Sequence, residues 1–261
     1  MGSSKNISMS LIKNIFTELL ASFNLKAADF ITHDIMSRAA FEEINEFFYR
    51  IETQMINPSF APKRKQWAYD LTLKHCRRVA LYSLPVAQAG RFSDKEAAEI
   101  TVAGLLHDID KFYWPVKLLD TPPLELSKEE HTRIMEHTVA GAACVEMITK
   151  KNIAPGILAI IKQHHENFGG TGYPGRLAGA AISPGARIIR IVNSYDTMTS
   201  PRPYKTGINT HAEAINSLKR RCNSTYDPDF VGLFEQSLPE EKIKSLKEVG
   251  DSSGFRRRDV I

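Results

Sequence analysis

The sequence predicts an all-α protein whose helices pack as an antiparallel bundle. Apolar residues recur with a helical period of about 3.6 along almost the whole chain. Two capping-box patterns, SDKE at residues 93–96 and SKEE at residues 127–130, mark helix starts. No alternating run of apolar and polar residues is long enough to predict a strand, and we find no internal repeat. With 261 residues, 43% of them hydrophobic, the chain is long enough for one large domain or two small ones.

The first part of the chain contains two predicted amphipathic helices, at residues 10–24 and 37–55. A proline-rich joint, NPSFAPKRK, follows them. Because proline interrupts helices, this joint predicts a boundary between an N-terminal helical extension, residues 1–60, and the main domain, residues 61–240. The extension carries an apolar stripe, a pattern that is more often core packing than a dimer interface. The stripe consists of Phe41, Ile44, Phe47 and Phe48.

The main domain begins with a predicted helix over 67–88. The capping box at 93–96 opens the next helix, which ends at the segment HDIDK, and the capping box at 127–130 opens a helix that runs to about Lys150. Further helices are predicted near 155–166, 186–199, 210–222, 227–237 and 239–248. Pro201 and Pro203 stop the helix over 186–199. Residues 241–261 form the end of the last helix and a basic tail.

Composition argues against a membrane protein, a disulfide-rich protein and a nucleic-acid-binding protein. The apolar runs are broken within about ten residues, short of the roughly 20 that a membrane span needs. Cys76, Cys144 and Cys222 are odd in number and far apart, which argues against a disulfide scaffold. We therefore expect a cytoplasmic protein without a membrane span. The net charge of +4 is small and the basic tail FRRRD is short, so nucleic-acid binding is not predicted.

Histidines recur along the main domain at intervals of about 30 residues, which is the length of two antiparallel helices with their loops. Residues at this interval return to the same level of a bundle, so we expect them to converge. A single histidine on an apolar helix face would more often be a hydrogen-bonded core residue. The converging set comprises His75, His107, Asp108, His137, His164, His165, Asn193 and Asp196.

Imidazoles with few carboxylates in an apolar bundle suit first-row transition metals such as iron, manganese, nickel or zinc. The pairs His107–Asp108 and His164–His165 leave room for two divalent ions, and Asp108 could bridge both because a carboxylate has two oxygens. Lys111, which is not a metal ligand, would be available to bind an anion. Taken alone, HDIDK would fit a buried structural His–Asp hydrogen bond equally well. A second His–Asp pair, His33–Asp34, does not fall at the interval of about 30 residues and is predicted to be a helix cap.

Five motifs occur in order: HDIDK (107–111), EHTVAG (136–141), HHENFGGTGYPGRLAG (164–179), ARIIRIVNSYDTMTSPRPYK (186–205) and DPDFVGLF (227–234). Together they resemble an HD-GYP domain, a subgroup of the HD metal-dependent phosphohydrolases. The resemblance runs from about Lys74 to Phe234. A single His–Asp pair would be weak support, whereas the ordered set is specific.

The resemblance implies an HD-type helical bundle with a centre of two or three metals, usually iron or manganese. Such proteins hydrolyse cyclic di-GMP to linear pGpG or to GMP. Two ions a few ångströms apart convert a bridging water to hydroxide near neutral pH. Asp108 and Lys111 are then implied as catalytic residues, and Lys111, Tyr173 and Arg202 as substrate contacts. The implied metal ligands are His75, His107, Asp108, His137, His164, His165 and either Asn193 or Asp196.

Four positions depart from the family pattern. Asp110 replaces the glycine of HDxGK, and Gly169 replaces the aspartate of HHExxDGxGYP. Asn193 stands where the last metal-binding aspartate is usual, and Asp196 matches a second aspartate of the same segment. Leu71 stands where three-metal members carry glutamate, so we expect at most two metals.

These departures leave two functions open. The first is a cyclic dinucleotide phosphodiesterase with a binuclear site. The second is a catalytically degenerate member that binds a cyclic dinucleotide or a signalling protein without turnover. A second copy of the chain, forming a homodimer, is the alternative protein partner. The retained histidines favour the enzyme, and the GYP and RPY segments disfavour an HD phosphohydrolase acting on other nucleotides. Metal content discriminates the two, because a pure interaction module has no need of stoichiometric metal.

Overall fold

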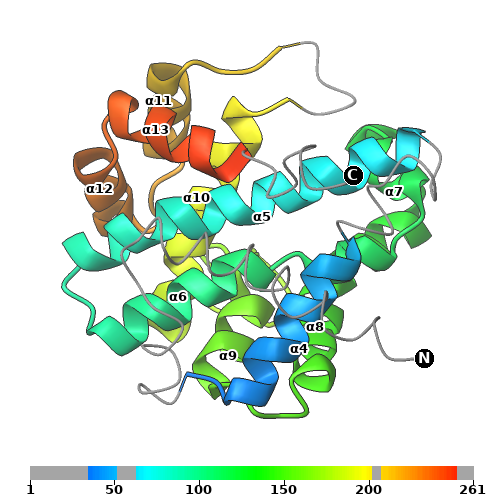
Figure 1. Ribbon diagram of the computed structural model, residues 1–261. Helices are drawn as coiled ribbons and strands as arrows, with labels where there is room; N and C mark the ends of the chain where they lie inside the picture. Colours follow the sequence, from blue (N-terminus) through cyan, green and yellow to red (C-terminus); the bar gives the residue numbers. More distant parts are fainter. Residues whose placement is uncertain (1–34, 52–62, 202–206, 252–261) are drawn as a thin grey trace, which may run out of the picture.

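A computed structural model describes residues 35–51, 63–201 and 207–251, and within these ranges the protein is all-α, as predicted (Figure 1). No strand occurs in the described ranges, where only isolated β-bridges such as Met36–Ile153 are found. The predicted helix over 10–24, the His33–Asp34 cap and Arg202 lie outside the described residues. No helix of the described part is long and apolar enough to cross a membrane.

The described helices follow the predicted order, except that the helix Val116–Asp120 was not predicted. They are α4 (Arg38–Arg50), α5 (Lys63–Ala89), α6 (Asp94–Leu106), α7 (Val116–Asp120), α8 (Lys128–Ile148), α9 (Pro155–Gln163), α10 (Pro184–Thr199), α11 (His211–Arg220), α12 (Pro228–Ser237) and α13 (Glu240–Asp251). Short 3₁₀ helices, which the periodicity did not predict, are η2 (Ile109–Tyr113), η3 (Pro123–Glu125) and η4 (Gly179–Ala181). They are too short to show a period.

Capping residues set the helix starts. Both predicted capping boxes are confirmed, with Ser93 and Glu96 opening α6 and Ser127 and Glu130 opening α8. A third box, formed by Thr210 and Glu213, opens α11. Each box satisfies backbone N–H groups that a helix end leaves without partners.

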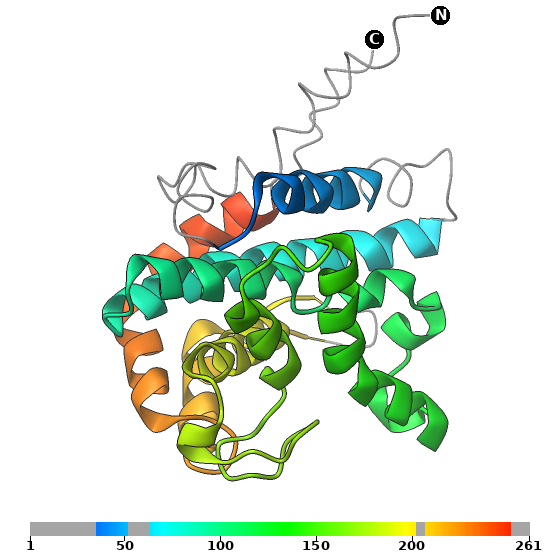
Figure 2. The same ribbon diagram turned by 90° about the horizontal axis from the view of Figure 1, so that it is seen from below.

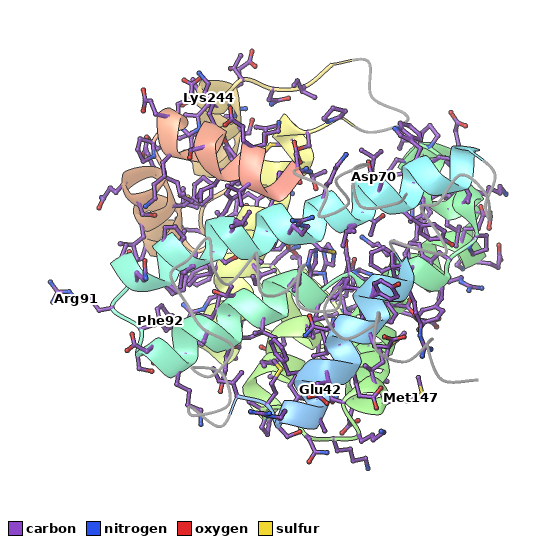
Figure 3. All side chains as sticks on the ribbon, viewed as in Figure 1. Glu42, Asp70, Arg91, Phe92, Met147 and Lys244 are labelled. Carbon is purple, nitrogen blue, oxygen red and sulfur yellow. The ribbon has the colours of Figure 1, made fainter. Side chains whose placement is uncertain are left out.

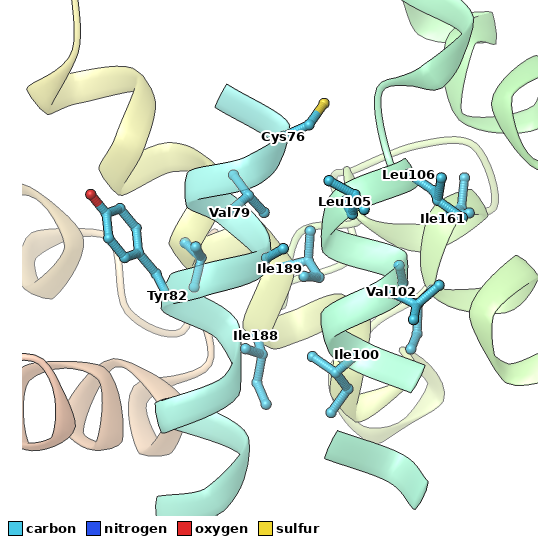
Figure 4. Close-up of a cluster of buried hydrophobic side chains, with 14 of the residues drawn as sticks. Cys76, Val79, Tyr82, Ile100, Val102, Leu105, Leu106, Ile161, Ile188 and Ile189 are labelled. Atoms are coloured by element: carbon cyan, nitrogen blue, oxygen red, sulfur yellow. The ribbon is translucent and has the colours of Figure 1, made fainter. Parts of the chain in front are cut away.

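The core lies where α5, α6 and α10 meet. Val79 of α5, Leu105 of α6 and Ile189 of α10 are at most 1% exposed and point into the same space (Figure 4). α5 and α6 approach closely at Gly104, where an added Cβ would lie 3.1 Å from the Ala80 Cα. The tight turn between these antiparallel helices carries Arg91, which projects from the edge of the molecule (Figure 3).

α4 lies on the outer side of the bundle (Figure 2) and packs through the predicted apolar stripe. Ile44 and Phe48 are each 1% exposed. Phe47 contacts the ring of Phe112 at a centroid distance of 6.0 Å, and Phe112 belongs to the turn that follows His107 and Asp108. The stripe is therefore core packing in this chain, and it touches the HDIDK segment.

Candidate metal centre

Two groups of side chains with metal-binding atoms lie in the interior of the bundle. The first comprises His75, His107 and Asp108, and the second comprises His137, His164 and His165. Within each group the candidate ligand atoms all lie within 4.8 Å of one another. The residues come from four helices or helix ends, α5, α6, α8 and α9, so the predicted convergence of these six residues is observed.

Asp108 belongs to the first group and also faces the histidines of the second. Its Oδ2 is 3.4 Å from His107 Nε2 and 3.7 Å from His75 Nε2. Its Oδ1 is 3.4 Å from His137 Nε2 and 4.0 Å from His164 Nε2. Each carboxylate oxygen thus faces a different group of histidines, which is the arrangement that a bridging carboxylate requires.

The local chain path explains this position. α6 ends at Leu106, His107 occupies the C-cap, and Asp108 leaves the helical region with φ −110° and ψ 19°. Lys111 N–H donates to the Asp108 carbonyl at 3.0 Å and closes the 3₁₀ turn. The change of direction turns both His107 and Asp108 inward, where they are at most 1% exposed.

Hydrogen bonds fix the orientation of the imidazoles. The Nδ1 atoms of His107 and His164 donate to backbone carbonyls at 2.8 and 2.7 Å, and His137 Nδ1 makes the same bond to Ile134. In each case the carbonyl belongs to the residue three positions earlier. Because Nδ1 carries the proton, Nε2 presents a lone pair toward Asp108. Fixing the tautomer in this way is the usual role of the outer partners of metal-binding histidines.

Burial favours the neutral form of His137, His164 and His165. It lowers the pKa of His137 to about 4, with a further contribution from Lys111, and lowers the pKa of His164 and His165 well below the ordinary value. For Asp108, burial alone would raise the pKa, but His107 and Lys111 hold it well below its ordinary value. The group of His137, His164 and His165 is therefore neutral at neutral pH, whereas the Asp108 carboxylate beside it is ionised.

These residues fit a cation. His107 Nε2 and Asp108 Oδ1 are buried acceptors without a hydrogen-bond partner among the described residues. His137 Nε2 and His164 Nε2 face each other at 3.1 Å, and both carry lone pairs. Such an arrangement is repulsive unless positive charge lies beside it. Neutral imidazoles with one carboxylate are the donor set of first-row transition metals.

The closest contacts of Asp196 are with Arg78 and with the ring nitrogen of His75 that does not face Asp108. Its Oδ2 lies 2.6 Å from His75 Nδ1, and it receives hydrogen bonds from Arg78 at 2.6 and 3.0 Å. Burial alone would raise the pKa of this carboxyl, but Arg78 and His75 hold it far below its ordinary value. Asp196 is therefore placed to orient His75 through the Nδ1 atom of that imidazole.

Asn193 lies one turn before Asp196 on α10 and is 7% exposed. Its Oδ1 accepts a long hydrogen bond of 3.4 Å from Thr197. Leu71, at the position of the third-metal glutamate, lines a cavity of about 160 Å³ together with His75 and Asp108. An apolar side chain at this point offers no further ligand.

The predicted substrate contacts Lys111 and Tyr173 both lie beside the centre. Lys111 Nζ donates to Asp108 Oδ2 at 2.7 Å and lines the cavity that reaches His75. The Tyr173 ring stacks on His165 with centroids 4.9 Å apart and an angle of 15° between planes. Arg202, the third predicted contact, lies outside the described residues.

Two departures from the family pattern have local partners. Asp110, in the HDIDK segment, accepts a hydrogen bond from Trp114 Nε1 at 2.7 Å, so its carboxylate is directed to the indole. Gly169 N–H donates to the Ser224 carbonyl at 2.9 Å, and an added Cβ would lie 3.0 Å from that oxygen. A larger residue at position 169 would displace the chain around Ser224.

Sequence reasoning missed two residues that support the site. Arg78 follows His75 by three positions, one helical turn, and pairs with Asp196. Glu166, 2% exposed, accepts backbone N–H bonds from Gly175 and Leu177 and so holds the loop that carries Tyr173. A charged residue directly after His164–His165 was the only available signal for Glu166, whereas Arg78 had none.

Comparison with known proteins identifies a family and several relatives of this chain. A profile described as HD domain matches residues 65–230. The chain is 32% identical over 169 residues to a cyclic di-GMP phosphodiesterase of Pseudomonas aeruginosa, covering 65% of this chain and 40% of that protein. It is 31% identical over 180 residues to a cyclic di-GMP phosphodiesterase of Thermotoga maritima, covering 69% and 46%. A 3'3'-cGAMP-specific phosphodiesterase of Vibrio cholerae is 28% identical over 154 residues, covering 59% and 35%. The matched part thus spans less than half of these relatives.

Solved structures share the fold. An HDG"Y"P protein from Bdellovibrio bacteriovorus superposes with a TM-score of 0.54 at 20% identity, covering 89% of this chain and 68% of that one. A cyclic GMP-AMP phosphodiesterase of Vibrio cholerae superposes with a TM-score of 0.52 at 16% identity, covering 70% and 52%. The profile match covers more than half of the chain and includes every histidine of the centre. The chain therefore belongs to the HD domain family.

Proposed function

We propose that this protein hydrolyses a phosphodiester bond of a cyclic dinucleotide, with cyclic di-GMP as the substrate and pGpG, GMP or both as products. The observation that carries the proposal is the position of Asp108, whose two oxygens face separate histidine groups at 3.4 Å. The relatives named for their substrates act on cyclic di-GMP or on 3'3'-cGAMP, which supports a cyclic dinucleotide.

Two divalent transition-metal ions, iron or manganese, are part of the proposal. His75, His107 and Asp108 would hold one ion, and Asp108, His137, His164 and His165 would hold the other. Asn193 is retained as an additional ligand through its amide oxygen. When bound, such ions supply a nucleophile at neutral pH and stabilise charge on phosphate oxygens.

The protein's own residues provide the other requirements of phosphodiester hydrolysis. Lys111 places a positive charge 2.7 Å from Asp108, where it can neutralise a phosphate oxygen of the substrate. Tyr173 lies over His165 and offers an aromatic ring and a hydroxyl at the edge of the centre. Arg202 remains a proposed contact to a phosphate or to a guanine edge.

A non-catalytic receptor for the same ligands is the second candidate. The observation in its favour is Asn193, because a neutral amide is a weaker ligand than the carboxylate usual at this position and leaves two dications less neutralised. This candidate predicts nucleotide binding without product.

The test is hydrolysis of cyclic di-GMP by protein purified anaerobically and reconstituted with iron or manganese, with metal content measured on the same sample. We expect linear or mononucleotide product together with about two metals per chain. Bound nucleotide without product would favour the receptor. Neither binding nor product would contradict both candidates.

A further inference from the structure

A groove of about 670 Å³ runs beside the metal centre, between α8 and the loop over residues 170–176. This volume is within the range of sites that hold small organic ligands. Met135, Glu136 and Val139 line it from α8, and Tyr173 and Arg176 line it from the loop.

The groove borders the candidate metal centre at Tyr173, which lines the groove and contacts two of the histidines. Tyr173 stacks on His165 and lies 6.3 Å from His137 between ring centroids. Glu136 directly precedes His137 on α8. A ligand with one group at the histidines can therefore place another group in the groove.

The lining combines an apolar surface with two opposite charges. Met135 and Val139, four residues apart on one helix face, remain 48% and 46% exposed although they are apolar. Glu136 and Arg176 are also exposed, and neither forms an ion pair within 4.0 Å in the described part of the chain. Apolar contact together with an acceptor on one wall and a donor on the other suits a flat, polar-edged ring.

Hydrogen bonds to Glu166 hold the backbone on both sides of Arg176. The φ of Arg176 is 52°, a left-handed conformation that is unfavourable for a non-glycine residue. The buried carboxylate of Glu166 accepts the N–H groups of Gly175 at 2.5 Å and Leu177 at 3.0 Å, on either side of Arg176. The loop is thereby fixed in the form that places Arg176 at the groove.

We propose that this groove binds a guanine base of the substrate and selects guanine over adenine. The inference rests on the proposed cyclic dinucleotide function and adds its base specificity. Guanine presents N–H donors on its Watson–Crick edge, which match the two oxygens of Glu136. Its O6 and N7 acceptors match the guanidinium of Arg176, the commonest bidentate contact to guanine. Adenine presents the N1 acceptor to Glu136, which repels the carboxylate, and on its other edge it keeps N7 but replaces O6 with an amino donor, so Arg176 retains at most one of its two hydrogen bonds.

The test uses the metal-reconstituted full chain with GMP and AMP as probes, since these nucleotides contain no phosphodiester to hydrolyse. Dissociation constants are measured by calorimetry for the native protein, for Glu136→Gln and for Arg176→Asn, in which asparagine tolerates the positive φ. Glu129→Gln is the matched control, because Glu129 is an exposed glutamate two turns earlier on α8 that does not line the groove. Hydrolysis of cyclic di-GMP and cyclic di-AMP is compared on the same samples.

We expect the native protein and Glu129→Gln to bind GMP about tenfold or more tightly than AMP, and Glu136→Gln and Arg176→Asn to lose most of this preference. Equal affinity for GMP and AMP in the native protein, no binding of either, or a preference that survives in Glu136→Gln would overturn the inference. Hydrolysis of cyclic di-GMP with no preference for GMP over AMP would refute the base selectivity of the groove and leave the enzymatic function standing. A preference for GMP without any hydrolysis would refute the enzymatic function alone.

Discussion

The Nε2 atoms of His137 and His164 lie 3.1 Å apart, although the two residues are separated by 27 positions in the sequence. Both imidazoles carry their proton on Nδ1, so two lone pairs face each other in a buried space. The fold thus holds an arrangement that is unfavourable in the metal-free protein and favourable around a cation.

Metal-free protein should lose stability as the pH falls below neutral. The pKa of His137 is about 4 in the folded protein and near 6.5 when unfolded, so between these values the unfolded chain binds a proton that the folded chain does not. The free energy of unfolding therefore decreases with falling pH, by roughly 2 kcal/mol from His137 alone between pH 7.5 and pH 5. Urea unfolding of chelator-treated protein at the two pH values measures this. Equal stability at both would contradict the assignment of a buried, neutral imidazole.

Replacing Asp108 by alanine should abolish metal binding and turnover together. Both histidine groups lose the oxygen that they share, so we expect the metal affinity to fall by more than the roughly 100-fold typical of losing an outer partner. His131→Ala, an exposed histidine on α8, is the control and should retain metal and activity. Metal analysis after dialysis and the hydrolysis assay provide the measurements. Metal retention by Asp108→Ala would exclude the bridging role.

Asp196→Asn should weaken metal binding without removing a direct ligand. The substitution weakens the hydrogen bond that orients His75, and we expect a loss of metal affinity of roughly 10- to 100-fold. Asp251→Asn is the matched control, because Asp251 is the other carboxylate that pairs with Arg78 and has no contact with a histidine of the centre. Competition titration with a chelating dye compares the variants. A similar loss in Asp251→Asn would attribute the effect to Arg78 instead of His75.

Asn193→Asp should tighten the binding of one of the two ions. A carboxylate replaces a neutral amide at the position proposed as an additional ligand, which adds a negative charge near the dications. We expect the metal content after dialysis to rise and hydrolysis to increase with it. An unchanged affinity would show that Asn193 does not contact the ions.

Lys111→Met should separate binding of metal from turnover. Loss of the positive charge beside Asp108 should lower kcat/KM by roughly 100-fold or more while the metal content stays near that of the native protein. Lys117→Met, which removes an exposed lysine paired with Glu130, serves as the control and should leave kcat/KM unchanged. Equal activity of the two variants would remove Lys111 from the proposed mechanism.

The order of helices and the identity of the converging histidines could be predicted from the sequence because both depend on local rules. Helical periodicity, capping boxes and the interval of two helices require no knowledge of how elements cross. The first residues of α6 and α8 followed from Ser93 and Ser127 for this reason. The short 3₁₀ turn after Asp108, which directs its side chain, carried no such signal.

Only the tertiary structure decided which polar atoms meet. Asp196 pairs with Arg78 across 118 positions of sequence, and nothing in either local pattern distinguishes this contact from a metal ligand. The same holds for the contact of Phe47 with Phe112 and for Glu166 beneath the loop of Arg176. Local patterns specify the face that a helix buries, whereas the crossing of helices and the path of loops specify the partner. The sequence by itself determined the family and the residues that converge on the candidate centre, whereas packing determined the partners of each residue around it.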